Sequence, residues 1–427
     1  MYSALQTLSP LARWAQNATT VAGLKNGTSG SSQSTLNQNR GISIASDGTL
    51  YIADLLNNRI VLIGPNSTTA IASITTDSAS QNLFMYPSDV FVTQKYIYVL
   101  DMLNYQVVKL FLNRTNPVTV AGIKGVRGRS LNTSTLVTVT SIFVDNNENL
   151  YVSDIGNNIV IRYPPNSSSG MPGLIVAGNG TARSSTLQYM PSGIFVDEAG
   201  TLYVADAPNH QIQIWYNEAS SGVTVAGTGI SGSSLSQLFL PMGVVVDSNG
   251  YMYIMDSGNR RILRWPPNSN SGECIVACTG FAVNTVDTFN FALAIAFDSY
   301  GSIFISDTGS NRVQKFQILD SFGPTSTTTS TSTTTSIVLT TTTTTTAITT
   351  TTTTTITTIT TTTAITTIPT ITTTSSSLQI PSVARIPRPT AVTISITVLV
   401  MFFFYPKIFH GTFNHSSDNF LAFILLS

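Results

Sequence analysis

The sequence predicts an all-β fold, a six-bladed β-propeller over residues 1–323, from three observations. Six segments of similar sequence follow one another, and each has an aspartate at the end of its second apolar run. These aspartates recur 47 to 53 residues apart, at Asp54, Asp101, Asp154, Asp206, Asp256 and Asp307. Each unit offers short β-forming runs separated by turns, and four such runs make one propeller blade. The sixth unit lacks its fourth run, and the N-terminal region supplies a matching one.

The runs within a unit differ in pattern. The first is a continuous apolar triplet, as at 194–196 and 244–246, which predicts an inner strand buried on both faces. An Asp-x-x-Gly turn at 197–200 follows it, then a second run at 202–204 and another turn at 206–209. The third run alternates, as at 262–265, so we expect it further from the axis. The fourth run, "TVAG" or a variant, is expected at 118–122, 174–178, 223–227 and 274–278.

The two ends of the repeat region predict how the ring closes. The sixth unit stops at 316–318 without a fourth run, whereas a "TTVAG" run occurs at 19–23, shortly after Trp14. The N-terminal strand is therefore expected to complete the last blade, which removes an open sheet edge.

The repeat pattern, G-[IV]-x-V-D-x-x-G-x-[LI]-Y-[VI]-[AS]-D-x-x-N followed by a polar pair and Ile or Val, resembles the NHL repeat. The stretch at 209–212, Asn-His-Gln-Ile, stands where that family's naming motif lies. Departures occur at Ala45, Thr93 and Ile159. The resemblance covers about residues 13–318 and implies a six-bladed propeller. Relatives include zinc lyases with several histidines, lactonase-like enzymes with an axial Glu/Asn/Asp metal cluster, RNA binders with a basic face, and ubiquitin-pathway proteins with a RING.

Composition excludes several of these classes. Residues 1–323 hold 17 basic and 19 acidic side chains, so a concentrated positive face for nucleic acid is not expected. Two cysteines are too few for a RING, and one histidine before residue 400 is too few for a multi-histidine metal site. His210 is interpreted as an exposed turn residue. We predict no catalytic residue, no metal site and no cofactor.

The six second-run aspartates are predicted to be structural, each accepting hydrogen bonds from turn N–H groups two or three residues on. A metal or catalytic role is the alternative for them. The first-run aspartates Asp145, Asp197, Asp247 and Asp298 are interpreted in the same way, although a ring of carboxylates near the axis could hold one cation. Cys274 and Cys278, four apart in one strand, would lie ~13 Å apart. That distance is too long for a mutual disulfide unless a bulge or turn intervenes.

The C-terminal region differs in composition from the repeats. Residues 324–389 are mostly threonine, and no charged residue occurs from Gly323 to Ala384. Such a segment cannot bury a core, which predicts a disordered, O-glycosylated stalk or a plain disordered linker. Residues 390–406 are predicted to form one hydrophobic transmembrane helix, followed by a short tail at 407–427. The 15-residue apolar run would span only ~22 Å as a helix, so Lys407 is expected to snorkel.

Orientation in the membrane follows from mixed signals. Arg385 and Arg388 precede the apolar segment and Lys407 follows it, which slightly favours a cytoplasmic propeller. The stalk and the glycosylation sequons of the repeat region favour the outside, and 1–13 has no recognisable signal peptide. These sequons begin at Asn17, Asn26, Asn66, Asn113, Asn132, Asn166 and Asn179. The prediction is a single-pass membrane protein with an extracellular propeller.

The function predicted from these features is non-enzymatic. We expect a monomeric, membrane-tethered propeller that binds a protein or glycan partner through loops between strands. One alternative is a metal-dependent propeller hydrolase or lyase. Another is an intracellular tail-anchored scaffold related to ubiquitin-pathway NHL proteins.

Overall fold

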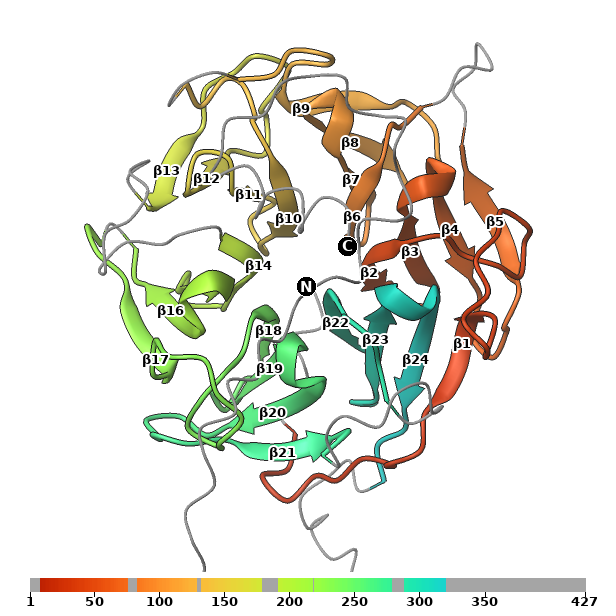
Figure 1. Ribbon diagram of the computed structural model, residues 1–427. Coiled ribbons are helices and arrows are strands. Elements are labelled where there is room, and N and C mark those ends of the chain that lie inside the picture. Colours follow the sequence, from red (N-terminus) through yellow and green to blue (C-terminus); the bar gives the residue numbers. More distant parts are fainter. Residues whose placement is uncertain are drawn as a thin grey trace, which may run out of the picture. The chain divides into compact units, whose positions relative to one another are not determined.

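The computed structural model describes residues 8–75, 83–128, 132–178, 191–217, 219–278 and 288–319. In these ranges the chain forms six four-stranded antiparallel sheets, arranged radially around an axis in Figure 1. This confirms the prediction of an all-β six-bladed propeller. The predicted stalk, hydrophobic helix and tail lie outside the described residues. Within the described ranges, no helix is long and apolar enough to cross a membrane.

The strands of each blade follow one another from the axis outward, with one exception in blade 6. Blades 1 to 3 contain β2 (Asn39–Ile44), β3 (Leu50–Asp54), β4 (Arg59–Ile63) and β5 (Ala70–Ile74); β6 (Pro87–Val92), β7 (Tyr96–Asp101), β8 (Gln106–Phe111) and β9 (Val118–Gly122); and β10 (Val139–Val144), β11 (Leu150–Asp154), β12 (Ile159–Tyr163) and β13 (Leu174–Ala177). Blades 4 to 6 contain β14 (Pro191–Val196), β15 (Leu202–Asp206), β16 (Gln211–Trp215) and β17 (Val223–Gly227); β18 (Pro241–Val246), β19 (Met252–Asp256), β20 (Arg261–Trp265) and β21 (Glu273–Val276); and β22 (Ala294–Phe297), β23 (Ile303–Asp307), β24 (Arg312–Phe316) and β1 (Thr19–Gly23).

The N-terminal strand closes the ring as the sequence predicts. Strand β1 pairs antiparallel with β24, with Thr19 opposite Lys315, and lies beside it in Figure 1. Trp14 strengthens this closure, because its buried indole Nε1 donates a hydrogen bond to the Gly301 carbonyl at 2.8 Å. Blade 6 therefore joins the two ends of the repeat region, which leaves no open edge between its third strand and solvent.

Short turns set the direction of the chain at both ends of a blade. In the first hairpin of blade 4, Asp197 Oδ1 accepts the Thr201 N–H at 2.8 Å, and Gly200 has a φ of +83°. Between the second and third strands, five blades place a single 3₁₀ turn and then a residue in the left-handed region. These turns are η1 (Leu55–Asn57), η2 (Met102–Asn104), η3 (Ala207–Asn209), η4 (Ser257–Asn259) and η5 (Thr308–Ser310).

The core lies between blades rather than within one layer. In the described residues, buried apolar side chains gather into six clusters that combine strands of neighbouring sheets. The inner-strand triplets show how both faces of a sheet are used. In blade 3, Ile142 and Val144 are buried in one cluster, whereas Phe143 packs against the next one. The middle residue, Phe143, is only half-buried, because it also faces the propeller axis. The predicted full burial of the triplet therefore holds for Ile142 and Val144 but not for Phe143.

Candidate ligand-binding site

The second-strand aspartates lie at strand ends, away from the axis, and all six are fully buried. For five of them, in all blades but the fourth, a carboxylate oxygen accepts a main-chain N–H from 16 or 17 residues upstream, such as Asn37 for Asp54 at 2.7 Å and Phe239 for Asp256 at 2.7 Å. In blades 1 to 5 an oxygen also accepts the side-chain amide of an asparagine three residues on, such as Asn57 for Asp54 at 2.8 Å. The expected turn N–H donor is found at Asp154, whose Oδ1 accepts the Gly156 N–H at 3.2 Å, and the donors described above act in addition to it. Where both contacts are described, the carboxylate links the loop entering its blade to the turn leaving its second strand.

A long polar side chain five residues on completes this arrangement. Arg59, Arg261 and Arg312 each donate Nε–H to the aspartate of their blade, at 2.7, 2.8 and 2.8 Å. In blades 2 and 4 a glutamine does so, Gln106 at 2.7 Å and Gln211 at 2.9 Å. Burial raises the pKa of carboxyls such as Asp101 and Asp154, and the hydrogen bonds they accept oppose that rise. These carboxylates are thus enclosed and held by donors of their own blades.

The first-strand aspartates, in contrast, lie at the mouth of an axial cavity. Each is held by its own hairpin: Asp145 Oδ1 accepts the Asn147 and Asn149 N–H groups at 2.9 Å. Asp247 accepts two N–H groups in the same way, and its Oδ2 accepts the Tyr253 hydroxyl at 3.2 Å. The structure thus brings Asp145, Asp197, Asp247 and Asp298 to one rim of the cavity without directing them at a common point.

The axial cavity is enclosed by the inner strands β2, β6, β10, β14, β18 and β22 and has a volume of about 620 Å³. That volume lies within the range of small-molecule sites, roughly 300–1,000 Å³. Exposed hairpin residues such as Asn146, Asn147 and Ser248 line one end, which is therefore its mouth. A narrower chamber of about 60 Å³ lies at the start of the inner strands, where Arg40 and Ser88 are buried.

Three phenylalanines form an arc on one wall of this cavity. Phe91, Phe143 and Phe195 occupy the middle position of the inner strands of blades 2, 3 and 4. Their rings meet edge to face, with centroids 5.0 Å apart for Phe91 and Phe143 and 5.2 Å for Phe143 and Phe195. The other three blades have small or aliphatic residues at this position, Ser43, Val245 and Ala296. The wall opposite the arc therefore carries smaller side chains at this position of the inner strands.

Asp89 is the acidic residue deepest in the cavity, and it lines both the cavity and the narrower chamber. Its carboxylate accepts the Val90 N–H at 2.9 Å and, across the blade boundary, the Ile142 N–H at 2.8 Å. Burial raises its pKa to about 7. The equivalent residue in three other blades is glycine, and a Cβ on Gly41 would fall 2.6 Å from the Asp89 Cα. Asp89 is therefore accommodated by the absence of a side chain in the neighbouring blade.

His210 stands in the left-handed position that follows η3, and its Nδ1 accepts the Leu240 N–H at 3.2 Å. It packs against Phe239 with ring centroids 5.6 Å apart, and partial burial lowers its pKa. Within the described ranges, no three His, Cys, Asp or Glu side chains are grouped so that they could hold a metal ion.

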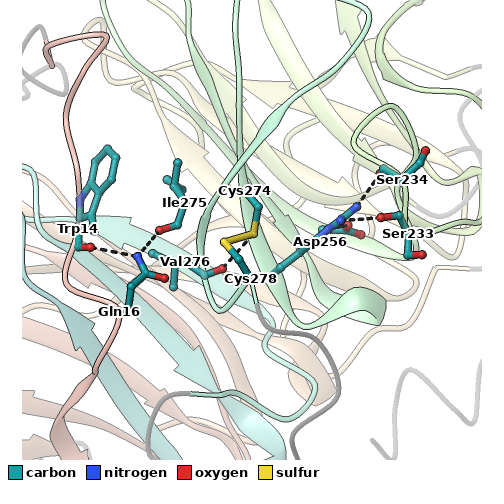
Figure 2. Close-up of a disulfide and its surroundings, with 10 residues drawn as sticks. Trp14, Gln16, Ser233, Ser234, Asp256, Cys274, Ile275, Val276 and Cys278 are labelled. Carbon is teal, nitrogen blue, oxygen red and sulfur yellow. Dashed lines mark hydrogen bonds and ion pairs between the residues drawn. A yellow bond between two sulfur atoms is a disulfide. The ribbon is translucent and has the colours of Figure 1, made fainter. Parts of the chain in front are cut away.

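The favoured expectation that Cys274 and Cys278 are unpaired residues of one strand is wrong, because the intervening turn that a disulfide requires is present. Figure 2 shows the two sulfurs bonded, and the Cα atoms are 5.7 Å apart. The physical reason is that β21 ends at Val276 and Ala277 takes the left-handed conformation, with φ of +55°, so the chain turns back. A continuous strand was the wrong assumption. Beside the disulfide, Gln16 Nε2 donates to the carbonyls of Trp14 and Ile275, joining the N-terminal segment to blade 5.

The sequon asparagines lie on the surface wherever the structure describes them. Asn17, Asn26, Asn66, Asn113, Asn132 and Asn166 are exposed. Asn179 lies outside the described residues.

The phenylalanine arc and Asp89 are the residues that sequence reasoning missed. The sequence did contain an indication of them, because the inner strands of the six repeats differ most from one another at these two positions when they are aligned. Where other blades have Gly41, Gly193 or Gly243, blade 2 has an acid, and that departure marks Asp89.

Comparison with known proteins is consistent with this architecture. The sequence model of the NHL repeat matches residues 189–215. A Bacteroides thetaiotaomicron protein of unknown function is similar in structure, with a TM-score of 0.55, 16% identity, and coverage of 72% of this chain and 77% of that one. An auxiliary nutrient binding protein from the same organism has a TM-score of 0.51, 13% identity, and the same coverage of 72% and 77%.

A gluconolactonase from Xanthomonas campestris has a TM-score of 0.47 and 14% identity, covering 74% of this chain and 99% of that one. None of the curated proteins matches the chain. At such identities the likeness concerns the fold alone. The chain therefore contains an NHL repeat in blade 4, and it forms a six-bladed β-propeller whose other blades have the same four-stranded construction.

Proposed function

We propose that this protein is a non-enzymatic binding protein, which takes a projecting group of a protein or glycan partner into its axial cavity. The observation that carries the proposal is the arc of Phe91, Phe143 and Phe195, three half-buried aromatic rings facing a cavity of about 620 Å³. Aromatic rings kept partly in water at this position gain most when a ligand covers them. The hairpin loops at the mouth would supply the contacts to the rest of the partner.

The arrangement of the acids favours binding over chemistry. General acid–base or metal catalysis needs carboxylates that are free to reach a substrate atom or a metal. The rim carboxylates instead accept hydrogen bonds from their own hairpins; Asp298, for example, accepts the Tyr300 and Ser302 N–H groups and pairs with Lys315 Nζ at 3.0 Å. Their position therefore suits a fixed acidic surface.

We further propose that the propeller is displayed outside the cell and tethered by the segment at 390–406. The Cys274–Cys278 disulfide supports this orientation, because disulfides persist in oxidising compartments and are rare in the cytosol. The exposure of six sequon asparagines supports it as well, since glycans need solvent-accessible acceptors.

A binding panel tests the proposed function. Thermal unfolding of the full-length protein in detergent would be followed with neutral sugars, organic amines and neutral apolar alcohols as probes. We expect a saturable rise in Tm with at least one probe, lost in Phe143→Ala and kept in the control Phe111→Ala. Phe111 is exposed on β8 and does not line the cavity.

Two results would count against the proposal. The first is a panel in which no probe raises Tm, or in which Phe143→Ala responds like the wild type. The second is turnover of a bound probe that is abolished by a chelator, which would favour the metal-dependent hydrolase or lyase instead.

A further inference from the structure

The charge on the wall of the axial cavity has one sign. Six acidic residues line it, and among its described lining residues there is no lysine, arginine or histidine. The six are Asp89, Asp145, Asp197, Glu198, Asp247 and Asp298. In a chain with only 20 acidic residues, such a concentration in one cavity is a marked local field. A concave, low-dielectric wall focuses that field and favours a positively charged occupant.

Some positively charged side chains lie close to the acidic residues of this wall without lining the cavity. Lys315 pairs with Asp298, and Arg40 lies in the narrower chamber that Asp89 also lines. Burial lowers the pKa of Arg40 to about 10, so its guanidinium stays charged at neutral pH. Arg264 is a third positive group, and its charge opposes the effect of burial on the pKa of Asp247. With Lys315 matched to Asp298, Arg264 to Asp247 and Arg40 set against one further carboxylate, the six acidic lining residues still outnumber the nearby bases.

The phenylalanine arc adds a second preference to the charge. The faces of aromatic rings carry negative potential, so a cation placed over such a face is attracted to it. Phe91, Phe143 and Phe195 are adjacent and edge to face, so their rings present differently oriented faces and edges to one volume. Ser43, Val245 and Ala296 on the other side leave room for a group with substituents.

A small inorganic cation fits this cavity poorly. Calcium and magnesium need several converging oxygen ligands. Here the rim carboxylates are turned to their own hairpins, as with Asp145 and Asp247, and the wall between them and Asp89 is apolar. An ammonium group with apolar substituents has the opposite requirement, because it is weakly hydrated and is stabilised by aromatic faces and one carboxylate.

We propose that the axial cavity binds an organic ammonium group, with its apolar substituents against the phenylalanine arc and its charge toward Asp89. This inference rests on the proposed function and names the chemistry of the group that the cavity receives. Such a group can be a free quaternary amine or a methylated lysine side chain of a protein.

Calorimetric titration of the full-length protein with choline and with 3,3-dimethylbutan-1-ol tests the inference. The two probes have nearly the same shape, and only choline is charged. We expect saturable choline binding, about tenfold tighter than binding of the neutral alcohol. Phe143→Leu, which keeps an apolar wall without a ring, and Asp89→Asn should each weaken choline binding several-fold, whereas the control Phe111→Leu should not.

The outcomes separate this inference from the broader proposal. Equal affinity for choline and the neutral alcohol would overturn the ammonium assignment and leave the binding function standing. Binding of neither probe would overturn the ammonium assignment alone if a sugar binds in the panel, and both proposals if nothing binds. Asp89→Asn is interpreted only if it unfolds cooperatively; otherwise Phe143→Leu decides. Displacement of choline by a trimethyl-lysine peptide, but not by the unmethylated peptide, would support a protein source for the group.

Discussion

At the scale of single residues, the second-strand aspartates are fully buried and hydrogen-bonded, so their removal is expected to destabilise the fold. Asp54 accepts hydrogen bonds from Asn37, Asn57 and Arg59, and the Arg59 guanidinium in turn donates to the carbonyls of Ser31, Ser32 and Thr35. Both partners are nearly inaccessible to water. Removing the acid would leave a buried guanidinium without its counter-charge.

We therefore expect Asp54→Ala to lower the free energy of unfolding by about 3–5 kcal/mol. Asp47→Ala is the matched control, because Asp47 is an exposed hairpin acid that accepts one N–H, from Thr49. Its loss should cost no more than about 1 kcal/mol. Urea unfolding midpoints measure both. Equal effects of the two substitutions would refute the structural role.

The burial of Asp89 leads to a second prediction, which concerns how the free energy of unfolding depends on pH. Its pKa is raised to about 7 by burial, above the ordinary value of 3.8, so the folded protein binds more protons than the unfolded chain between these values. Stability contributed by the protonated carboxyl is present at pH 4 and is lost as pH rises toward 7. The groups facing Asp89 are the N–H of Val90 and of Ile142, the Ser141 side chain and, in the adjoining chamber, Arg40.

The test compares wild type with Asp89→Asn between pH 4 and pH 8. The stability of the variant relative to wild type should increase by roughly 4 kcal/mol up to about pH 7 and then level off. The other buried aspartates are common to both proteins, so their titration cancels in the difference. The lost hydrogen-bond acceptor adds a constant offset, and only the slope decides. A difference independent of pH would contradict the assignment.

At the scale of elements, the disulfide depends on where the fourth strand of blade 5 ends. The sequence indicates a fourth strand over 274–278, and it is realised as Glu273–Val276 followed by the left-handed Ala277. The bond closes a loop at the outer edge of blade 5, next to Gln16. Its presence is a property of the compartment as well as of the fold.

We expect both cysteines to be oxidised in protein isolated from its native membrane. Alkylation under denaturing, non-reducing conditions should add no label, and alkylation after reduction should add two, as counted by mass spectrometry. The Cys274→Ser/Cys278→Ser pair should lose about 2 kcal/mol, the loop-entropy value for so short a ring. Two free thiols before reduction would speak against an outward-facing propeller.

Much of each element is predictable from sequence because the turns are chemically marked. The Asp-x-x-Gly hairpins of blades 4 to 6 and the aspartate near the end of each second strand locate these strands in the sequence, although the run predicted at 202–204 forms the longer strand Leu202–Asp206. The outer strand β5, Ala70–Ile74, was not predicted, since its sequence lacks the "TVAG" motif of its counterparts. It is an edge strand with four exposed or half-exposed positions, so packing places few demands on its residues.

At the scale of the whole molecule, the ring and its closure followed from the repeat, whereas the cavity did not. Repetition predicts what all blades share, and the candidate site consists of what they do not share. In the sequence, Phe91, Phe143 and Phe195 are simply the middle residues of apolar triplets. Only the arrangement of the blades around the axis shows that this middle residue faces the cavity. The role of Asp89 could not be predicted from the sequence, because only the structure shows that Gly41 leaves space beside it.

Topology of the full chain is the remaining prediction at this scale. On intact cells, external protease should remove the propeller from the membrane fraction, and deglycosylation should cause a large loss of apparent mass. Full protection from protease without a glycosidase shift would instead favour the intracellular tail-anchored scaffold. A glycan-free but protease-sensitive propeller would retain the outward orientation and remove the glycosylated stalk.

The central claim is that the axial cavity is the binding site, and an experimental structure with a bound probe tests it most directly. The full-length protein would be crystallised or imaged with a saturating amount of the tightest probe from the panel. We predict probe density enclosed by the inner strands, in contact with Phe143 and between the arc and Asp89. Density on the outer surface of the blades, with the axial cavity free of probe, would contradict the account.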